Sequence, residues 1–221
     1  IAHWRLEAAL SRLPLASDRV TSRAAVLGYL LAILLSSASS AEAWRLSAED
    51  RAALARREVV VHSEALSDQP ATARGREIRA AIRIRAPAKR VFAAMTHCET
   101  AIEFVPHLQQ CVLLDHDEVT GAEIIEHVVD YGWYAPSLRY TFRVEYVPDR
   151  SVIFRAVSGD LARNEGRWEL TPLNEDPATG VAETLLTYRV LVVPKFRIPQ
   201  SWVRVSLTRE LPRMLQALRD F

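Results

Sequence analysis

The sequence feature that most constrains the fold is a strict two-residue alternation between positions 138 and 146. Apolar or aromatic side chains occupy every second position, at Leu138, Tyr140, Phe142, Val144 and Tyr146, and the positions between them hold Arg, Thr, Arg and Glu. Because successive side chains of a strand point to opposite faces, this pattern predicts a strand with one aromatic face and one wet face. Such a face needs an apolar cover, so the strand predicts a second layer.

Further strands follow this one and are separated by turn-forming residues. Pro148-Asp149 forms the first turn, and Val152 and Phe154 then repeat the alternation. The segment 166–170 continues it, and the run 181–192 is long enough for a full-width strand. Consecutive strands joined by turns predict an antiparallel meander.

Upstream of position 106 the pattern changes from strand to helix. Positions 80, 82 and 84 are apolar and alternate with arginines, which predicts a strand. Pro87 then opens a short helix that carries Val91 and Met95, and a second short helix runs from Thr100 to Phe104.

The chain ends in an amphipathic pattern that begins near Pro199. Its apolar positions recur at helical spacing, and arginines occupy the opposite face. The stripe consists of Trp202 or Val203, Leu207, Leu211, Met214 or Leu215, and Leu218. Pro212 lies inside the pattern, so a bend or local break is expected there. This stripe is the one long enough to cover the aromatic sheet face.

Residues 1–43 have the order of parts found in a secretory signal peptide. Arg23 precedes a run of twelve apolar and small residues, 24–35, and the A-x-A site Ala41-Glu42-Ala43 follows. A membrane-spanning helix needs about 20 apolar residues, so this run is short for one. We expect cleavage after Ala43 and export to the periplasm or the extracellular space; an uncleaved amphipathic anchor and a buried core helix are the alternatives.

The remaining chain divides into an extension, 44–75, and a main domain, 76–221. The extension is expected to hold a short helix over about 48–57, capped by Ser47, and an edge strand at Val59-Val60-Val61. Basic and acidic residues number 28 and 27 and are scattered through the chain, so the sequence provides no basic stripe for nucleic acid.

Several short motifs resemble one known superfamily. The segment 82–92, IRIRAPAKRVF, resembles the I-x-A-P-x-x-x-V-F/W opening of the START-like (SRPBCC) superfamily, also called polyketide cyclase/dehydrase and lipid transport. The segments 104–108, 166–170 and 193–199 resemble its later landmarks, and together they cover about residues 76–221. Among its members, the motifs look most like those of the bacterial coenzyme Q-binding START domains.

The resemblance implies an α+β helix-grip fold. In this fold a curved antiparallel sheet of about seven strands wraps around a long C-terminal helix, and two short helices follow the first core strand. An apolar cavity is expected between the sheet and the helix. The superfamily supports several functions on one scaffold, so the resemblance does not select a ligand.

The large side chains on the concave face are the candidate ligand-binding residues. They are either ordinary core or the lining of a cavity that they do not fill. The candidates are Phe104, Tyr131, Trp133, Tyr140, Phe142, Phe154, Trp168, Tyr188, Trp202 and Leu211.

Cysteines and histidines suggest further chemistry. Cys98 and Cys111 form either a disulfide, as an exported protein permits, or two small buried apolar side chains. With His97 and His107 they lack the spacing of a zinc site, so no metal and no other cofactor is predicted. His127 is interpreted as a hydrogen-bonded strand histidine, with a general base as the alternative.

Three functions compete. The first is binding or transport of a hydrophobic small molecule, lipid-like or quinone-like, with transient membrane contact. The second is an aromatic polyketide cyclase or dehydrase, which needs Arg, His, Tyr or acidic groups facing the cavity. The third is a protein-interaction module with a vestigial cavity. The predicted inward positions are mainly apolar, and the sequence shows no catalytic triad motif or nucleotide-binding loop, which favours binding over catalysis.

Overall fold

A computed structural model describes residues 44–66, 75–132, 136–173, 180–197 and 199–220. The expected leader, residues 1–43, lies outside this range. None of the described helices is long and apolar enough to cross a membrane.

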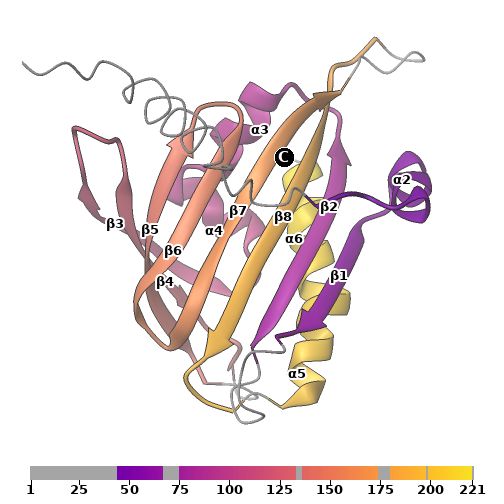
Figure 1. The fold of residues 1–221 in the computed structure, drawn as a ribbon. Helices are drawn as coiled ribbons and strands as arrows, with labels where there is room; N and C mark the ends of the chain where they lie inside the picture. The colour runs from indigo at the N-terminus through magenta and orange to yellow at the C-terminus, as the bar shows by residue number, and fades with distance from the viewer. Residues whose placement is uncertain (1–43, 67–74, 133–135, 174–179, 198, 221) are drawn as a thin grey trace, which may run out of the picture. The chain divides into compact units, whose positions relative to one another are not determined.

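The described strands form one antiparallel sheet, drawn in Figure 1. The sheet order is β1-β2-β8-β7-β6-β5-β4-β3, so β2 pairs with the last strand and the others follow as a meander. The strands are β1 (Val60–Ala65), β2 (Arg76–Ile84), β3 (Leu108–His116), β4 (Glu123–Val129), β5 (Leu138–Val147), β6 (Ser151–Gly159), β7 (Leu161–Leu173) and β8 (Glu183–Pro194). The predicted helix-grip fold is confirmed, with eight strands in the sheet because β1 adds an edge to β2.

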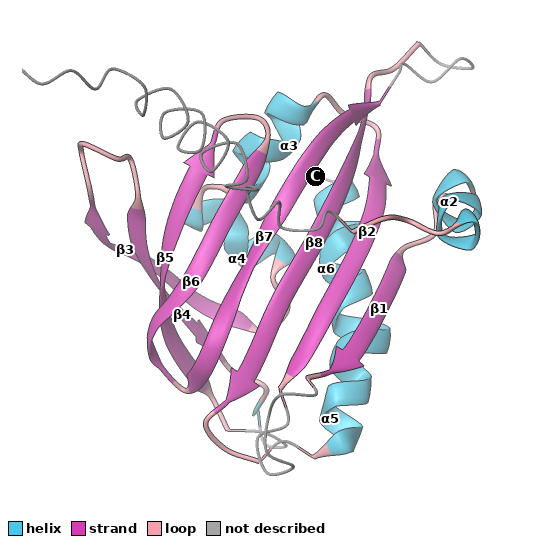
Figure 2. Cartoon of the chain, in the orientation of Figure 1, coloured by secondary structure: helices cyan, strands magenta, loops and turns pink. Residues whose placement is uncertain are grey.

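Four helical segments lie on one face of the sheet, behind it in the view of Figure 2. They are α3 (Ala88–Met95), α4 (Cys98–Phe104), α5 (Gln200–Val205) and α6 (Leu211–Asp220). The helix α2 (Ala48–Ala55) lies beside the sheet, before β1. Its N-terminus is fixed by the predicted Ser47 cap, which forms a reciprocal capping box with Asp50.

The expected irregularity at Pro212 takes the form of a π turn. Between α5 and α6 the helix widens over η2 (Ser206–Glu210), and the N–H of Leu211 donates to the carbonyl of Ser206, five residues earlier. Proline has no N–H, and its ring crowds the carbonyl four residues before it, here Thr208. A π turn next to this position is one known way for a helix to accommodate such a break.

The packed core lies between α6 and the strands β2 and β8. Ile82, Leu186 and Leu215 each have no exposed surface there, and Leu218 is also buried. The predicted C-terminal stripe is therefore used in two ways. Its last part packs against the core, whereas Leu207, Leu211 and Met214 line a cavity.

Candidate ligand cavity

A cavity of about 410 Å³ lies within the domain, lined by the inner face of the sheet, by α4 and by the η2–α6 segment. The predicted aromatic side of β5 is turned entirely towards this cavity. All five alternating positions of that strand line the cavity: Leu138, Tyr140, Phe142, Val144 and Tyr146. The alternation read from the sequence therefore gave the correct inward face.

Aromatic rings form a connected series along the cavity wall. The ring of Phe142 meets that of Phe154 edge to face, with their centroids 6.4 Å apart. Phe154 stacks with Tyr188 at 6.2 Å, and Tyr188 stacks with Trp168 at 4.0 Å. Trp168 and Tyr188 are direct cross-strand partners of β7 and β8, which holds their rings together. The wall is therefore largely aromatic, and the β7–β8 pairing holds Trp168 against Tyr188.

Eight of the ten candidate residues lie around this cavity: Phe104, Tyr131, Tyr140, Phe142, Phe154, Trp168, Tyr188 and Leu211. Trp133 lies outside the described residues. Trp202 is partly buried on α5 and is not among the described lining residues. Nine residues separate it from Leu211, and at about 100° per residue an ideal helix places them on opposite sides. At this spacing one straight helical stripe does not bring both residues to the cavity.

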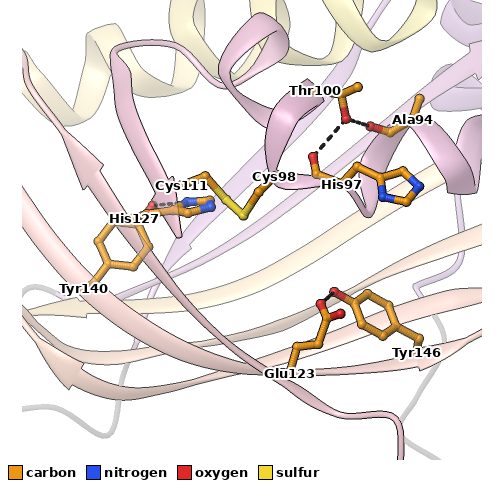
Figure 3. Close-up of a disulfide and its surroundings, with 9 residues drawn as sticks. All are labelled: Ala94, His97, Cys98, Thr100, Cys111, Glu123, His127, Tyr140 and Tyr146. Carbon is orange, nitrogen blue, oxygen red and sulfur yellow. Dashed lines mark hydrogen bonds between the residues drawn. A yellow bond between two sulfur atoms is a disulfide. The ribbon is translucent and has the colours of Figure 1, made fainter. Parts of the chain in front are cut away.

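A disulfide closes part of the wall. Cys98 at the start of α4 is joined to Cys111 on β3, with 5.3 Å between their Cα atoms, and both residues line the cavity (Figure 3). The sequence allowed either a disulfide or two small buried apolar side chains at these positions, and the structure contains the disulfide. It attaches α4 to the edge strand β3, so the helix and the strand that border the cavity are covalently linked.

His127 and Tyr140 form the main polar feature of the wall. They are partners in the β4–β5 pairing, and the Tyr140 hydroxyl lies 3.4 Å from Nδ1 of His127, beside the disulfide (Figure 3). Burial lowers the pKa of His127 to about 4 and raises the pKa of the Tyr140 phenol. Both side chains are therefore neutral near pH 7.

Tyr188 and Tyr146 also line the cavity, and their hydroxyl groups have different surroundings. Burial also raises the pKa of Tyr188, whose phenol interacts electrostatically with that of Tyr140. Tyr146 instead donates its hydroxyl hydrogen to Glu123 at 2.6 Å, away from the His127–Tyr140 pair (Figure 3). Burial and this bond raise the pKa of the Tyr146 phenol.

Charge is distributed unevenly between the two faces of the sheet. No arginine or lysine is among the described lining residues, and the acid among them is Glu210, whose Oε2 lies 3.4 Å from Nε2 of His107. On the outer face Arg189 and Arg79 both donate to Glu77, at 2.7 and 2.6 Å. The described lining is therefore mostly apolar, with neutral hydrogen-bonding groups and one acid, Glu210.

The sequence pattern predicted the position of His127 but not that of Glu210. The alternation on β4 placed His127 on the same face as Val129 and Tyr131, and all three line the cavity. Glu210 had no such signal, because it lies on the π turn. Among the described residues, no three His, Cys, Asp or Glu side chains are grouped as metal ligands would be.

Comparison with solved structures supports the fold. A START superfamily protein from Mycobacterium smegmatis has a TM-score of 0.53 at 18% identity, covering 65% of this chain and 94% of its own. A STAR-related lipid transfer protein from Xanthomonas axonopodis has a TM-score of 0.52 at 20% identity, covering 73% and 92%. The human StarD13 lipid transfer and protein localization domain has a TM-score of 0.55 at 13% identity, covering 73% and 83%.

A search of curated protein sequences gave no match. The model of the family described as polyketide cyclase / dehydrase and lipid transport, in contrast, matches residues 84–219. This match begins at the last residue of β2 and spans the strands β3 to β8 and the C-terminal helix, in agreement with the resemblance seen in the motifs. The chain belongs to the polyketide cyclase/dehydrase and lipid transport family, a START-like family.

Proposed function

We propose that this protein binds and carries a hydrophobic small molecule, lipid-like or quinone-like, in its internal cavity. The observation that carries the proposal is the unfilled volume of about 410 Å³ behind an aromatic wall. Protein interiors normally contain few voids larger than a water molecule, and ligand pockets begin at about 300 Å³. Two of the similar structures are described as lipid transfer proteins or domains, which agrees with this proposal.

Catalysis by a cyclase or dehydrase is the second candidate, and the His127–Tyr140 pair is the observation that favours it. A histidine with a nearby phenol can polarise a carbonyl and move a proton. A pKa of about 4, however, makes the His127 imidazole a weak base at neutral pH. With no arginine or lysine among the described lining residues to stabilise an enolate, binding is the better supported function.

Export is part of the proposal. The leader pattern at residues 1–43 supports it, and so does the Cys98–Cys111 disulfide, since such bonds persist in oxidising compartments. N-terminal sequencing of the protein recovered from its native host tests this part. A mature N-terminus at or near Trp44 is expected, and one upstream of Ala24 would contradict cleavage.

The binding function is tested with the purified full chain. Mass spectrometry of an organic extract should identify a co-purified apolar compound, and Nile red should gain fluorescence when it is titrated with the protein. Ala101, a buried α4 residue of the cavity wall, is replaced by Phe to fill the space. Ala101→Phe should weaken Nile red binding at least about tenfold, because an added phenyl ring occupies the volume that the dye needs.

The matched control is Val157→Phe, which adds a ring to an exposed position of β6. This variant should bind Nile red as the wild type does. Thermal unfolding of both variants separates loss of the cavity from loss of the fold, since overpacking costs about 1–3 kcal/mol. An empty extract together with no Nile red binding would contradict the proposed function.

A further inference from the structure

Two polar side chains of the cavity wall, His127 and Tyr140, are paired with each other. His127 and Tyr140 are hydrogen-bonded partners on β4 and β5, and the phenol of Tyr140 interacts electrostatically with those of Tyr131 and Tyr188. The rings of Phe142, Phe154 and Trp168 make the neighbouring wall apolar. A ligand against these rings therefore has the His127–Tyr140 pair as a polar partner. Further polar groups of the lining belong to Thr96, His97, Asn164, Ser206 and Glu210.

The His127–Tyr140 pair keeps one unused donor whichever tautomer it has. If the phenol donates to Nδ1, then Nε2 of the neutral imidazole carries the remaining N–H. If Nδ1–H donates to the phenol oxygen, then the Tyr140 O–H is free to donate. In both cases one N–H or O–H is not used within the pair and is available to donate to a ligand in the cavity.

The same region does not suit an anion. Transfer of a carboxylate or phosphate out of water requires a cation or several donors, and the described lining residues include no arginine or lysine. Glu210, the acid in the lining, lies 3.4 Å from His107 and 3.9 Å from Arg213, and a carboxylate provides no donor for an anion.

We infer that the cavity selects a neutral ligand whose carbonyl oxygen accepts a hydrogen bond from the His127–Tyr140 pair, with its apolar body against the aromatic wall. This inference rests on the proposed function and narrows it. It favours neutral ketones and quinones over fatty acids and phospholipids. His127 and Tyr140 are thus specificity-determining residues, whereas the rings supply contact area without selecting the head group.

Equilibrium dialysis with three matched probes tests the inference. 2-Acetylnaphthalene has a neutral carbonyl, 2-ethylnaphthalene lacks the oxygen, and 2-naphthoate has an anionic head on the same ring. At pH 7.5 the wild type should bind 2-naphthoate at least about tenfold more weakly than 2-acetylnaphthalene, because a buried unpaired anion costs far more than a neutral carbonyl. Equal binding of these two probes would overturn the inference.

The pair itself is tested with the double variant His127→Phe/Tyr140→Phe. A double change is needed because either single variant keeps the donor of the other residue. The preference is measured as the Kd of 2-ethylnaphthalene divided by that of 2-acetylnaphthalene, so that general changes of cavity shape cancel. This ratio should fall about threefold to tenfold in the double variant, the range expected for one neutral hydrogen bond. An unchanged ratio would overturn the assignment.

Val157→Phe is the control, because it changes an exposed position of β6 that is not among the described lining residues. Its ratio should equal that of the wild type. If the double variant does not fold, ¹⁵N spectra of histidine-labelled wild type decide: the His127 ring nitrogens should shift with 2-acetylnaphthalene and not with 2-ethylnaphthalene. Identical shifts with both probes would refute the inference.

The inference and the proposed function fail in different ways. If neither neutral probe binds the wild type, the cavity does not take apolar ligands and the proposed function fails. If both bind and the double variant keeps the wild-type ratio, the protein is a carrier whose selectivity has another origin.

Discussion

The burial of His127 makes a specific prediction about stability at acidic pH. Its folded-state pKa of about 4 lies below the ordinary value of 6.5, so the unfolded chain binds a proton more readily than the folded one. This contribution to stability is fully present above about pH 6.5. It is lost as the pH falls towards 4, because the neutral, buried imidazole must be exposed before it is protonated.

The magnitude follows from the two pKa values. Each tenfold difference in proton affinity corresponds to about 1.4 kcal/mol, so the full effect below pH 4 is about 3 kcal/mol. Between pH 7.5 and pH 4.5 the linkage relation gives a loss of about 2.5 kcal/mol. A His127→Phe variant keeps an aromatic ring beside Phe142 but cannot take up a proton, so it should lack this loss.

The assay is urea unfolding of wild type and variant at both pH values. All other titrating groups are common to both proteins, so the difference between their pH dependences isolates His127. Tyr140→Phe is the control. Burial is the cause of the low pKa, so removing the hydroxyl should leave the wild-type pH dependence in place. Equal losses of stability in wild type and His127→Phe would refute the reasoning.

Four further changes test the fold and the cavity. Reduction of the Cys98–Cys111 disulfide, which spans 13 residues, should lower the free energy of unfolding by about 3 kcal/mol; an unchanged urea midpoint with reductant would contradict a bridge in solution. Phe142→Ala should cost less than the 3–5 kcal/mol typical of a packed aromatic residue, yet weaken Nile red binding, because Phe142 borders open space. Leu186→Ala changes a core residue with no exposed surface, so it should lower the free energy of unfolding by about 2–5 kcal/mol and leave dye binding unchanged. If Leu186→Ala weakened dye binding more than Phe142→Ala and destabilised the fold less, the cavity would lie elsewhere. Gly166→Ala should destabilise the protein by at least about 1–3 kcal/mol, since the added Cβ would lie 2.2 Å from a backbone carbonyl oxygen of β8. A thermal midpoint equal to that of the wild type would show that β7 and β8 can separate at this position.

Local patterns determined much of this structure in advance. The alternation on β5 identified every cavity-facing residue of that strand, and Ser47 marked the start of α2. These signals depend only on backbone geometry, because a strand has a period of two and a helix one of 3.6 residues. The family motifs added the order of the elements, which gave the helix-grip topology.

Only the tertiary structure decided whether the aromatic face encloses space. Phe142 and Leu186 both occupy predicted inward positions, yet one borders a cavity and the other is fully packed. The difference depends on how far α6 lies from each strand of the sheet. That distance is set by the whole assembly and leaves no periodic trace in the sequence.

The pairing of functional side chains was likewise decided by the fold. His127 meets Tyr140 because β4 and β5 align in one register, and Cys98 reaches Cys111 because α4 packs at the edge strand β3. Trp202 shows the reverse, since the helical stripe included it but the turn of the helix directs it away from Leu211. The sequence by itself determined which face each residue occupies; strand register, helix phase and sheet-to-helix distance, which arise from long-range packing, decided which of those residues meet around the cavity.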